Sequence, residues 1–378
     1  MIVPGSSEWR ARTGAWSRGD RSAWAYVSGL VAARMGRLLE GAAFGELLRL
    51  KDGREVVARA RQSTLGEGLS AEGDWLGVGE GIDGAFRQRV AEMGRDCPDG
   101  TVTDFFGLQE ECRLLKRAAK ARLSPASSEE SASQAGVGEP GERSGRPRWE
   151  APLVEAERTV RALLSGGETA DEPVSWLIDL VYDGALLRSE ITLAEAIGGR
   201  WQGEGLARII LAWVELQSLL VVARAGRWPE PRKAEARPLR SVAQYLGSPG
   251  GAAEWLLPLY EVEEVDPTLL RLRWQVALQG VLGGALADRA EAAASPAERV
   301  PTEGGRGAAA LEQVARRGDE VLMEWVRGLR WVAFGPEPVF GYLWGLRAEA
   351  DNLKAVVGGV SAGVSPTLIS EQLRPAYG

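Results

Sequence analysis

The chain has 378 residues, of which 45% are hydrophobic, and it carries a formal net charge of −7 at pH 7. An acidic surface does not neutralise phosphates, so this charge argues against a general nucleic-acid-binding protein. The chain also contains no histidine, which excludes a Ser-His-Asp or Cys-His catalytic arrangement and removes the commonest general base and metal ligand.

Other signals of catalysis or membrane insertion are also missing. Cys97 and Cys112 lack CxxC spacing, and a reduced, cytoplasmic setting is expected. No GxxxxGK[ST] phosphate loop occurs, and the first 20 residues lack the apolar region of a signal peptide. The most apolar stretch contains Arg208, Glu215 and Arg224, too many charges for a membrane helix. We therefore expect a non-enzymatic protein with no catalytic, cofactor-binding or metal-binding residues and no membrane-spanning segment of its own.

Apolar residues recur at helical spacing along the chain, and no alternating strand pattern with hairpin turns is evident. The sequence therefore predicts an all-α fold, and its length suggests two or three compact units. We place a first helical unit at 1–123, a flexible linker at 124–150, a second unit at 151–237 and a third at 238–378. The third unit contains a flexible insertion near 287–308, because both this stretch and the linker are poor in large apolar residues.

The first unit begins with a basic, aromatic arm that includes Trp9 and Trp16. Such an arm either lies against a partner or lipid headgroups or is disordered. A helix is expected from about Ser22 to Glu40, and Thr103 is expected to cap a later helix. In the second unit, Thr192 and Glu195 have the spacing of a capping box and predict a helix start.

The C-terminal part predicts three successive helices. An apolar stripe covers residues 322–333, and the two prolines within 334–338 are expected to stop that helix. A second helix follows and ends at Gly358-Gly359. Its apolar stripe is Tyr342, Leu346, Ala350, Leu353 and Val357, and Arg347 and Asp351 are expected to pair on its solvated side. Ser365 and Pro366 start a short last helix, whose apolar residues are Leu368, Ile369 and Leu373.

Three helical stretches share a layout and predict three similar units. In each, a glutamate is followed four residues later by a leucine: Glu111 and Leu115, Glu215 and Leu219, and Glu349 and Leu353. In the first and third stretches a lysine comes next, Lys116 and Lys354.

The glutamates of these stretches have two interpretations. They could form an ion path or a carboxylate pair, but we favour hydrogen-bonded or solvated helix faces, because carboxylates with perturbed pKa values at functional sites are the minority. Asn352 could bind a partner, but we favour the satisfaction of a backbone group.

Residues 334–377 read FGPEPVFGYLWGLRAEADNLKAVVGGVSAGVSPTLISEQLRPAY. This stretch resembles the C-terminal signature of the C/d-type rotor proteins of V/A-type ATPases and ATP synthases: a Phe-Gly-x-Glu-Pro turn, a Gly-Tyr-Leu helix start, an acidic residue before Asn-Leu, a small-residue helix end and a final short helix. The matching residues are Phe334, Gly335, Glu337, Pro338, Gly341, Tyr342, Glu349, Asn352, Leu353, Gly359, Ile369, Leu373 and Tyr377. The chain departs from the family's repeated acidic-x-x-Asn pattern at Leu114 and Ser218.

The resemblance implies three helical domains arranged as a funnel with pseudo-threefold symmetry. The funnel receives the lower end of the central axle and rests on the proteolipid ring. It implies a central-stalk rotor adaptor on the cytoplasmic membrane that couples ATP chemistry to proton or sodium transport, with the axle proteins and the ring as partners. The alternative is a generic helical scaffold or regulatory interaction protein, and an enzyme with an unrecognised site is the third hypothesis.

Overall fold

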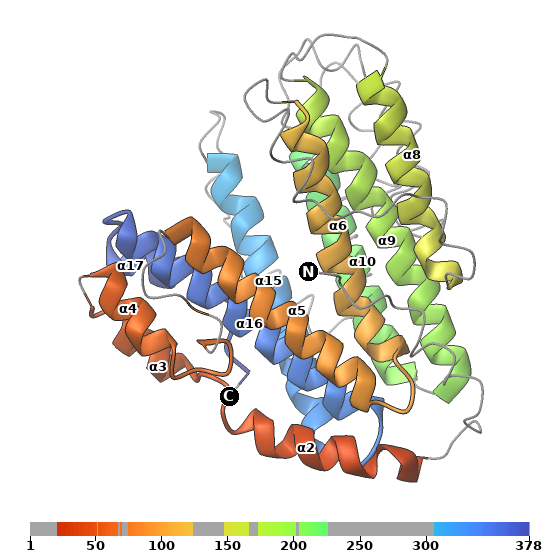
Figure 1. Ribbon diagram of the computed structural model, residues 1–378, viewed down its shortest axis with the longest axis horizontal. Coiled ribbons are helices and arrows are strands. Elements are labelled where there is room, and N and C mark those ends of the chain that lie inside the picture. Colours follow the sequence, from red (N-terminus) through yellow and green to blue (C-terminus); the bar gives the residue numbers. More distant parts are fainter. Residues whose placement is uncertain are drawn as a thin grey trace, which may run out of the picture. The chain divides into compact units, whose positions relative to one another are not determined.

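The computed structural model describes residues 21–50, 52–66, 69, 75–123, 147–165, 173–201, 204–225 and 306–377. Throughout these ranges the chain forms helices and no strand (Figure 1). The predicted all-α character is therefore confirmed for the described residues. None of the helices described in these ranges is long and apolar enough to cross a membrane.

Eleven α-helices and three short 3-10 helices lie in the described ranges. The α-helices are α2 (Ala25–Met35), α3 (Gly41–Leu47), α4 (Gly53–Ala60), α5 (Trp75–Asp96), α6 (Thr101–Ala121), α8 (Ala151–Ser165), α9 (Pro173–Trp201), α10 (Glu204–Ala225), α15 (Arg306–Gly328), α16 (Pro336–Ser361) and α17 (Pro366–Gln372). The 3-10 helices are η1 (Arg21–Trp24), η5 (Arg148–Glu150) and η8 (Leu329–Trp331).

The described helices divide into two compact units, and each unit contains segments of α6 and α15. One unit takes in the described residues from Leu108 to Gly318, and the other takes in those up to Gly107 and from Asp319 onward. The predicted boundaries at 123, 150 and 237 and the funnel symmetry stay predictions. Residues 1–20, most of the linker (124–146) and residues 226–305 with most of the insertion lie outside the described residues.

In the first of these units, α9 packs between α8 and α10, and Figure 1 shows these three helices side by side. Buried residues occur on several faces of α9, as expected for a helix with neighbours on more than one side. Thr192 and Glu195 lie in the interior of α9, where the Thr192 hydroxyl donates to the Arg188 carbonyl at 3.0 Å. The capping-box prediction was therefore wrong, because an uninterrupted apolar pattern carries the helix through this point.

In the second unit, α16 packs against α2, α3, α4, α5 and α17. The predicted apolar stripe of this helix, from Tyr342 to Val357, is confirmed, because all five of its members are buried. Asn352 and Glu349 are buried as well, at 1% and 2% exposure. Other parts of the unit therefore bury polar side chains of α16 as well as its apolar stripe.

Aromatic side chains from three helices form the centre of this second unit. Phe86 of α5, Phe105 and Phe106 of α6, and Phe340 of α16 are all 1% exposed or less. The rings of Phe105 and Trp344 are stacked, with centroids 5.9 Å apart and planes 9° from parallel. Phe340 contacts both Phe105 and Phe106, with centroids 5.3 Å apart in each case. Offset and edge contacts of this kind add to the stabilisation that burial alone provides.

Several helix ends differ from the prediction. The first long helix ends at Met35 rather than at Glu40, which is the N-cap residue of α3. α6 is preceded by Asp99, whose carboxylate accepts from the Thr101 backbone at 2.9 Å, whereas the Thr103 hydroxyl donates to the Gly100 carbonyl. Thr103, the predicted cap, and Asp99, which caps the helix in the structure, both have short polar side chains. The sequence pattern alone did not distinguish between them.

The prolines of 334–338 start α16 instead of stopping the preceding helix, because α15 already ends at Gly328. Proline is tolerated in the first helical turn, where its missing N–H has no partner to lose. At the other end, α16 continues past Gly359 to Ser361, and Gly363, with φ of 70°, follows it. Ser365 caps α17 as predicted. Of the apolar residues named on this helix, Ile369 is buried, whereas Leu368 is 56% exposed.

The aromatic centre gives a direct test of packing. We expect Phe340→Ala to lower the free energy of unfolding by about 3–5 kcal/mol, because it leaves a cavity between three helices. Tyr26→Ala on α2 is the matched control, because this ring is 73% exposed, and its effect should stay within about 0.5 kcal/mol. Urea titration followed by circular dichroism measures both changes. Equal effects of the two substitutions would contradict the placement of Phe340.

Candidate functional site

The polar residues singled out in the sequence lie in different parts of the chain. Glu111 of α6 and Glu215 of α10 are half-buried and belong to the unit around α9. Glu349 and Asn352 are buried on α16, in the other unit. The buried polar residues of α16 and their partners therefore form the candidate site.

Asn352 binds the backbone of the C-terminal segment, as the favoured interpretation predicted. Its side-chain nitrogen donates to the Arg374 carbonyl at 3.0 Å, and its oxygen accepts from the Arg374 N–H at 2.7 Å. Arg327 of α15 adds bonds from its guanidinium to the carbonyls of Tyr377, at 3.1 Å, and of Ala376. We call this arrangement of residues 373–377 on α15 and α16 the C-terminal clasp.

Glycines on α16 make room for the clasp. A Cβ on Gly345 would lie 2.7 Å from Tyr377 Cβ and 3.0 Å from Leu38 Cδ1, and a Cβ on Gly341 would lie 3.0 Å from the Tyr377 hydroxyl oxygen. Tyr377 is 5% exposed. The ring of Tyr377 therefore lies directly on the helix backbone, an approach that only glycine permits at Gly345.

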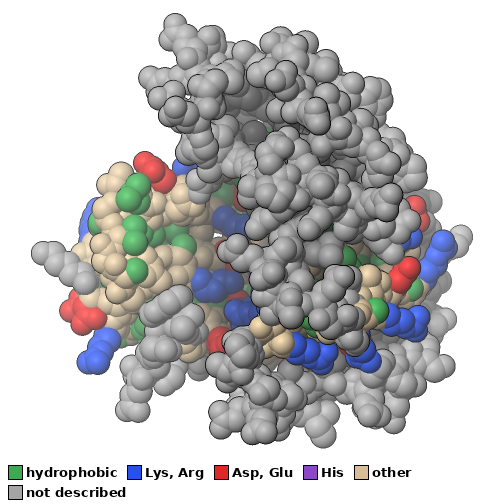
Figure 2. Space-filling model, turned by 90° about the horizontal axis from the view of Figure 1, so that it is seen from above, with side chains coloured by type: hydrophobic (Ala, Val, Ile, Leu, Met, Phe, Trp, Pro, Cys, Tyr) green, Lys and Arg blue, Asp and Glu red, His purple; other side chains and the backbone are tan. Residues whose placement is uncertain are grey.

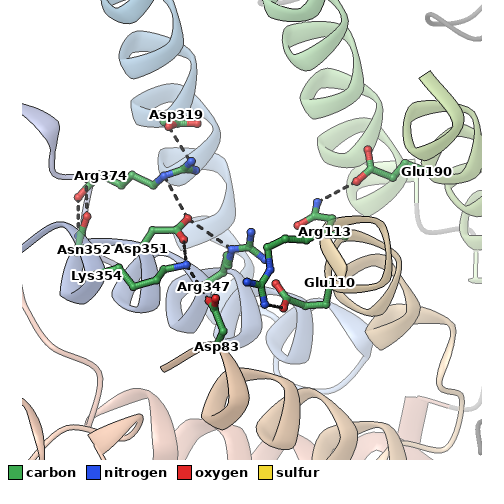
Figure 3. A network of polar contacts seen from close by, with 11 residues as sticks. Asp83, Glu110, Arg113, Glu190, Asp319, Arg347, Asp351, Asn352, Lys354 and Arg374 are labelled. Carbon is green, nitrogen blue, oxygen red and sulfur yellow. Dashed lines mark hydrogen bonds and ion pairs between the residues drawn. The ribbon is translucent and has the colours of Figure 1, made fainter. Parts of the chain in front are cut away.

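An ionic network surrounds Asp351 on the same helix (Figure 3). The Asp351 carboxylate pairs with Arg347 at 3.4 Å, Arg374 at 3.3 Å and Lys354 at 3.0 Å. Lys354 also reaches Asp83 of α5 at 2.8 Å. The network therefore connects α16 both to α5 and to the C-terminal clasp.

The same network fixes the protonation state of Asp351. Burial alone would raise the pKa of Asp351, but the charges of Arg347, Arg374 and Lys354 outweigh it and lower that pKa to about 2. Arg374 also pairs with Asp319 of α15 at 3.6 Å, and burial raises the pKa of Asp319 despite that partner. Asp351 is therefore ionised at neutral pH. Its predicted pairing with Arg347 is confirmed, and both side chains are half-buried on the more exposed face of α16.

Glu349 lies two residues away in a very different environment. One carboxylate oxygen accepts from the Leu39 N–H at 2.9 Å, and the other has no hydrogen-bond partner within the described ranges. The Ser63 hydroxyl is close enough to lower the pKa of Glu349 but makes no hydrogen bond of ordinary geometry. Burial dominates and raises that pKa to about 7. Glu349 thus changes charge near neutral pH while it holds the turn before α3.

The two lysines of the predicted repeat have similar partners. Lys116 of α6 pairs with Asp183 of α9 at 2.5 Å, and Lys354 of α16 pairs with Asp83 of α5 at 2.8 Å. In each case the lysine reaches a carboxylate on a neighbouring helix of its own unit. This agrees with a shared layout, although Leu114, at the position equivalent to Asn352, is 41% exposed.

Metal-ligating groups and thiols were the remaining candidates for chemistry among the described residues. No group of three or more metal-ligating side chains occurs among them. Burial raises the pKa of both thiols, and that of Cys112 reaches about 12. Neither cysteine is therefore a thiolate nucleophile near neutral pH.

Sequence reasoning found Arg347, Asp351 and Asn352 but missed Arg327 and Asp83. Helical spacing predicts side-chain pairs within α16, whereas Arg327 and Asp83 come from α15 and α5. No pattern in the local sequence indicates that they contact α16.

The glycine contact can be tested by a pair of substitutions. Gly345→Ala should lower the free energy of unfolding by about 1–3 kcal/mol, because the added methyl group collides with Tyr377. Gly29→Ala on α2 is the matched control, because nothing lies within 4 Å of the added Cβ. It should raise stability by up to about 1 kcal/mol through helix propensity. Thermal and urea unfolding of both variants measure the difference, and stabilisation by Gly345→Ala would contradict the clasp.

The environment of Glu349 predicts a pH dependence of stability. Because its pKa is raised in the folded protein, the folded state binds more protons than the unfolded state between about pH 4.5 and pH 7, and stability falls as the pH rises through this window. At pH 8 we expect Glu349→Gln to be more stable than the wild type by up to about 3 kcal/mol, from the size of the shift. At pH 5 the two should nearly agree.

Glu55→Gln, at an exposed position of α4, is the control and should not change the pH profile. Urea titrations from pH 5 to pH 8 provide the measurement. A constant difference between wild type and Glu349→Gln over this range would show that Glu349 does not titrate there.

Comparisons with models of known protein families and with curated proteins find no match to this chain. Its function is therefore inferred from its residues and their arrangement.

Proposed function

We propose that the chain is a non-catalytic rotor adaptor of a V/A-type ATPase or ATP synthase. In this role it seats the rotating central axle on the proteolipid ring and passes torque between them. It is a cytoplasmic protein held at the membrane through that complex. The resemblance of residues 334–377 to the C/d-type rotor proteins is the basis of this proposal.

One structural observation supports it most. Signature residues contact each other or the same short C-terminal segment: Asn352 binds the backbone of Arg374, Gly341 accommodates Tyr377, and Gly359 accommodates Ile369. Residues that match a pattern by chance need not contact each other in the folded chain. Residues of a family motif that stabilises one fold are expected to do so.

The mechanical role also suits the packing around α16. Close-packed interiors resist deformation and transmit strain. The aromatic centre, the network around Asp351 and the clasp connect α16 to α5, α6 and α15. Such a unit can carry load without any chemistry of its own.

The alternative is a helical scaffold or regulatory interaction protein. One observation favours it: the described residues divide into two compact units, whereas the rotor-adaptor family implies three. Binding to the axle proteins of a rotary complex separates the two proposals.

The experiment is a binding assay between the full chain and the purified central axle proteins of the same organism. We expect a one-to-one complex at about 10 μM protein in sedimentation velocity. An unrelated acidic helical protein serves as the control. Truncation before Phe334 is unsuitable as a control, because it removes α16 and with it the centre of one unit.

A second measurement addresses torque coupling. Adding the chain to membranes whose rotary complex lacks its adaptor should restore ATP-driven ion transport. If a chain with a helical spectrum and a cooperative melt neither binds the axle nor restores transport, the adaptor proposal fails and the scaffold proposal takes its place.

A further inference from the structure

An open groove of about 670 Å³ lies in the unit around α16, at the end of α3 and beside the turn between α16 and α17. It is far from Asp351 along the helix and shares no residue with the clasp. Its lining residues are Gly45, Leu48, Arg49, Leu50, Val360, Gly363, Val364, Ser365, Pro366, Thr367 and Ser370.

Local hydrogen bonds fix the wall of the groove that α16 and α17 form. The Val364 N–H donates to the Gly359 carbonyl at 2.9 Å, and the Gly363 N–H donates to the Val360 carbonyl at 3.0 Å. This is the Schellman arrangement, with Gly363 in the left-handed conformation. The groove is therefore built by a defined turn, which lowers the entropy cost of binding there.

α17 is held against α16 by one close contact. A Cβ on Gly359 would lie 2.7 Å from the side chain of Ile369, which is 3% exposed. The opposite face of α17 consequently points outward, and Leu368 is 56% exposed.

Apolar surface surrounds the groove. Val364 on its edge is 41% exposed. Hydrophobic side chains gather at the left of Figure 2, over the end of the molecule at which Figure 1 places α17. Apolar side chains that gather on one exposed surface are a feature of protein interaction sites.

The groove carries positive charge only. Arg49 is exposed and is the one charged residue that lines it, and no ion pair to Arg49 occurs within the described ranges. Glu46, at the end of α3, is paired with Arg59 at 3.6 Å. Ser365, Thr367 and Ser370 supply only hydroxyl groups. A ligand that covers the apolar floor would therefore gain from bringing a carboxylate to Arg49.

We propose that this groove binds an acidic, amphipathic segment of a partner protein. Apolar side chains of that segment cover Leu48, Val360 and Val364, and one of its carboxylates pairs with Arg49. A protein segment fits better than a small molecule, because small ligands are usually enclosed over 70–90% of their surface and this groove is open. The inference does not depend on the rotor-adaptor role.

The test uses a fluorescein-labelled helical peptide of 12 residues with leucine on one face and glutamate on the other. Fluorescence polarisation with the full chain should give saturable binding below about 1 mM. A peptide with lysine in place of every glutamate should bind about two- to fivefold more weakly, from the size of one exposed charge pair.

Variants locate the binding. Arg49→Glu should weaken the glutamate peptide about two- to fivefold and favour the lysine peptide, and Val364→Asp should weaken both. Arg54→Glu, at an exposed arginine of α4 outside the lining, is the matched charge reversal and should change neither. Thermal melts check that all three variants are folded.

Two results would overturn the inference. One is the absence of saturable binding of the glutamate peptide by the folded wild type up to about 1 mM. The other is binding that Arg49→Glu and Val364→Asp leave unchanged, which would place the peptide elsewhere on the chain.

Discussion

Burial of α16 along most of its length is the constraint on which its unit depends. Seventeen of its residues are buried, including the polar Glu349 and Asn352. Five helices pack against it, and the aromatic centre, the C-terminal clasp and the Asp351 network all include it. A buried helix cannot leave its polar groups unsatisfied at low cost. Asn352 meets this requirement with the Arg374 backbone, and one oxygen of Glu349 meets it with the Leu39 N–H.

Two carboxylates on this helix meet that requirement in opposite ways. Asp351 is surrounded by three cations, and its pKa falls to about 2. Glu349 has one backbone N–H and no cation among the groups that shift its pKa, which rises to about 7. Glu349 is buried and Asp351 is half-buried, and burial raises the pKa of each, so the opposite directions arise from the neighbouring charges. Asp351 is a permanent ionic link, whereas Glu349 is a link whose charge depends on pH near neutrality.

The sequence predicted what depends on local periodicity. Helical spacing identified the stripe from Tyr342 to Val357, and the Ser365-Pro366 pair identified the start of α17. The prediction from sequence failed where a contact between residues far apart in the chain determines the structure. Gly359 was read as a helix end, but it is the place where Ile369 packs, and the helix continues to Ser361.

The candidate site shows the same division. The pairing of Arg347 with Asp351 follows from i,i+4 spacing, whereas Asp83 and Arg327 come from other helices and no local signal marks them. Likewise, Glu349 was singled out by its spacing from Leu353, but its raised pKa comes from burial, which the hydrogen bond from the distant Leu39 N–H only partly offsets. The groove beside Val364 also depends on α3, which is more than 300 residues away in the sequence.

In the proposed role, the chain lies between the central axle and the proteolipid ring of a rotary ATPase. The measurement that tests it most directly is electron microscopy of membrane complexes purified through an affinity tag on this chain. The account predicts a rotary ATPase with the tagged chain at the junction of the central axle and the proteolipid ring. Purified material that contains no rotary ATPase proteins, or a rotary complex with the tagged chain at another position, would contradict it.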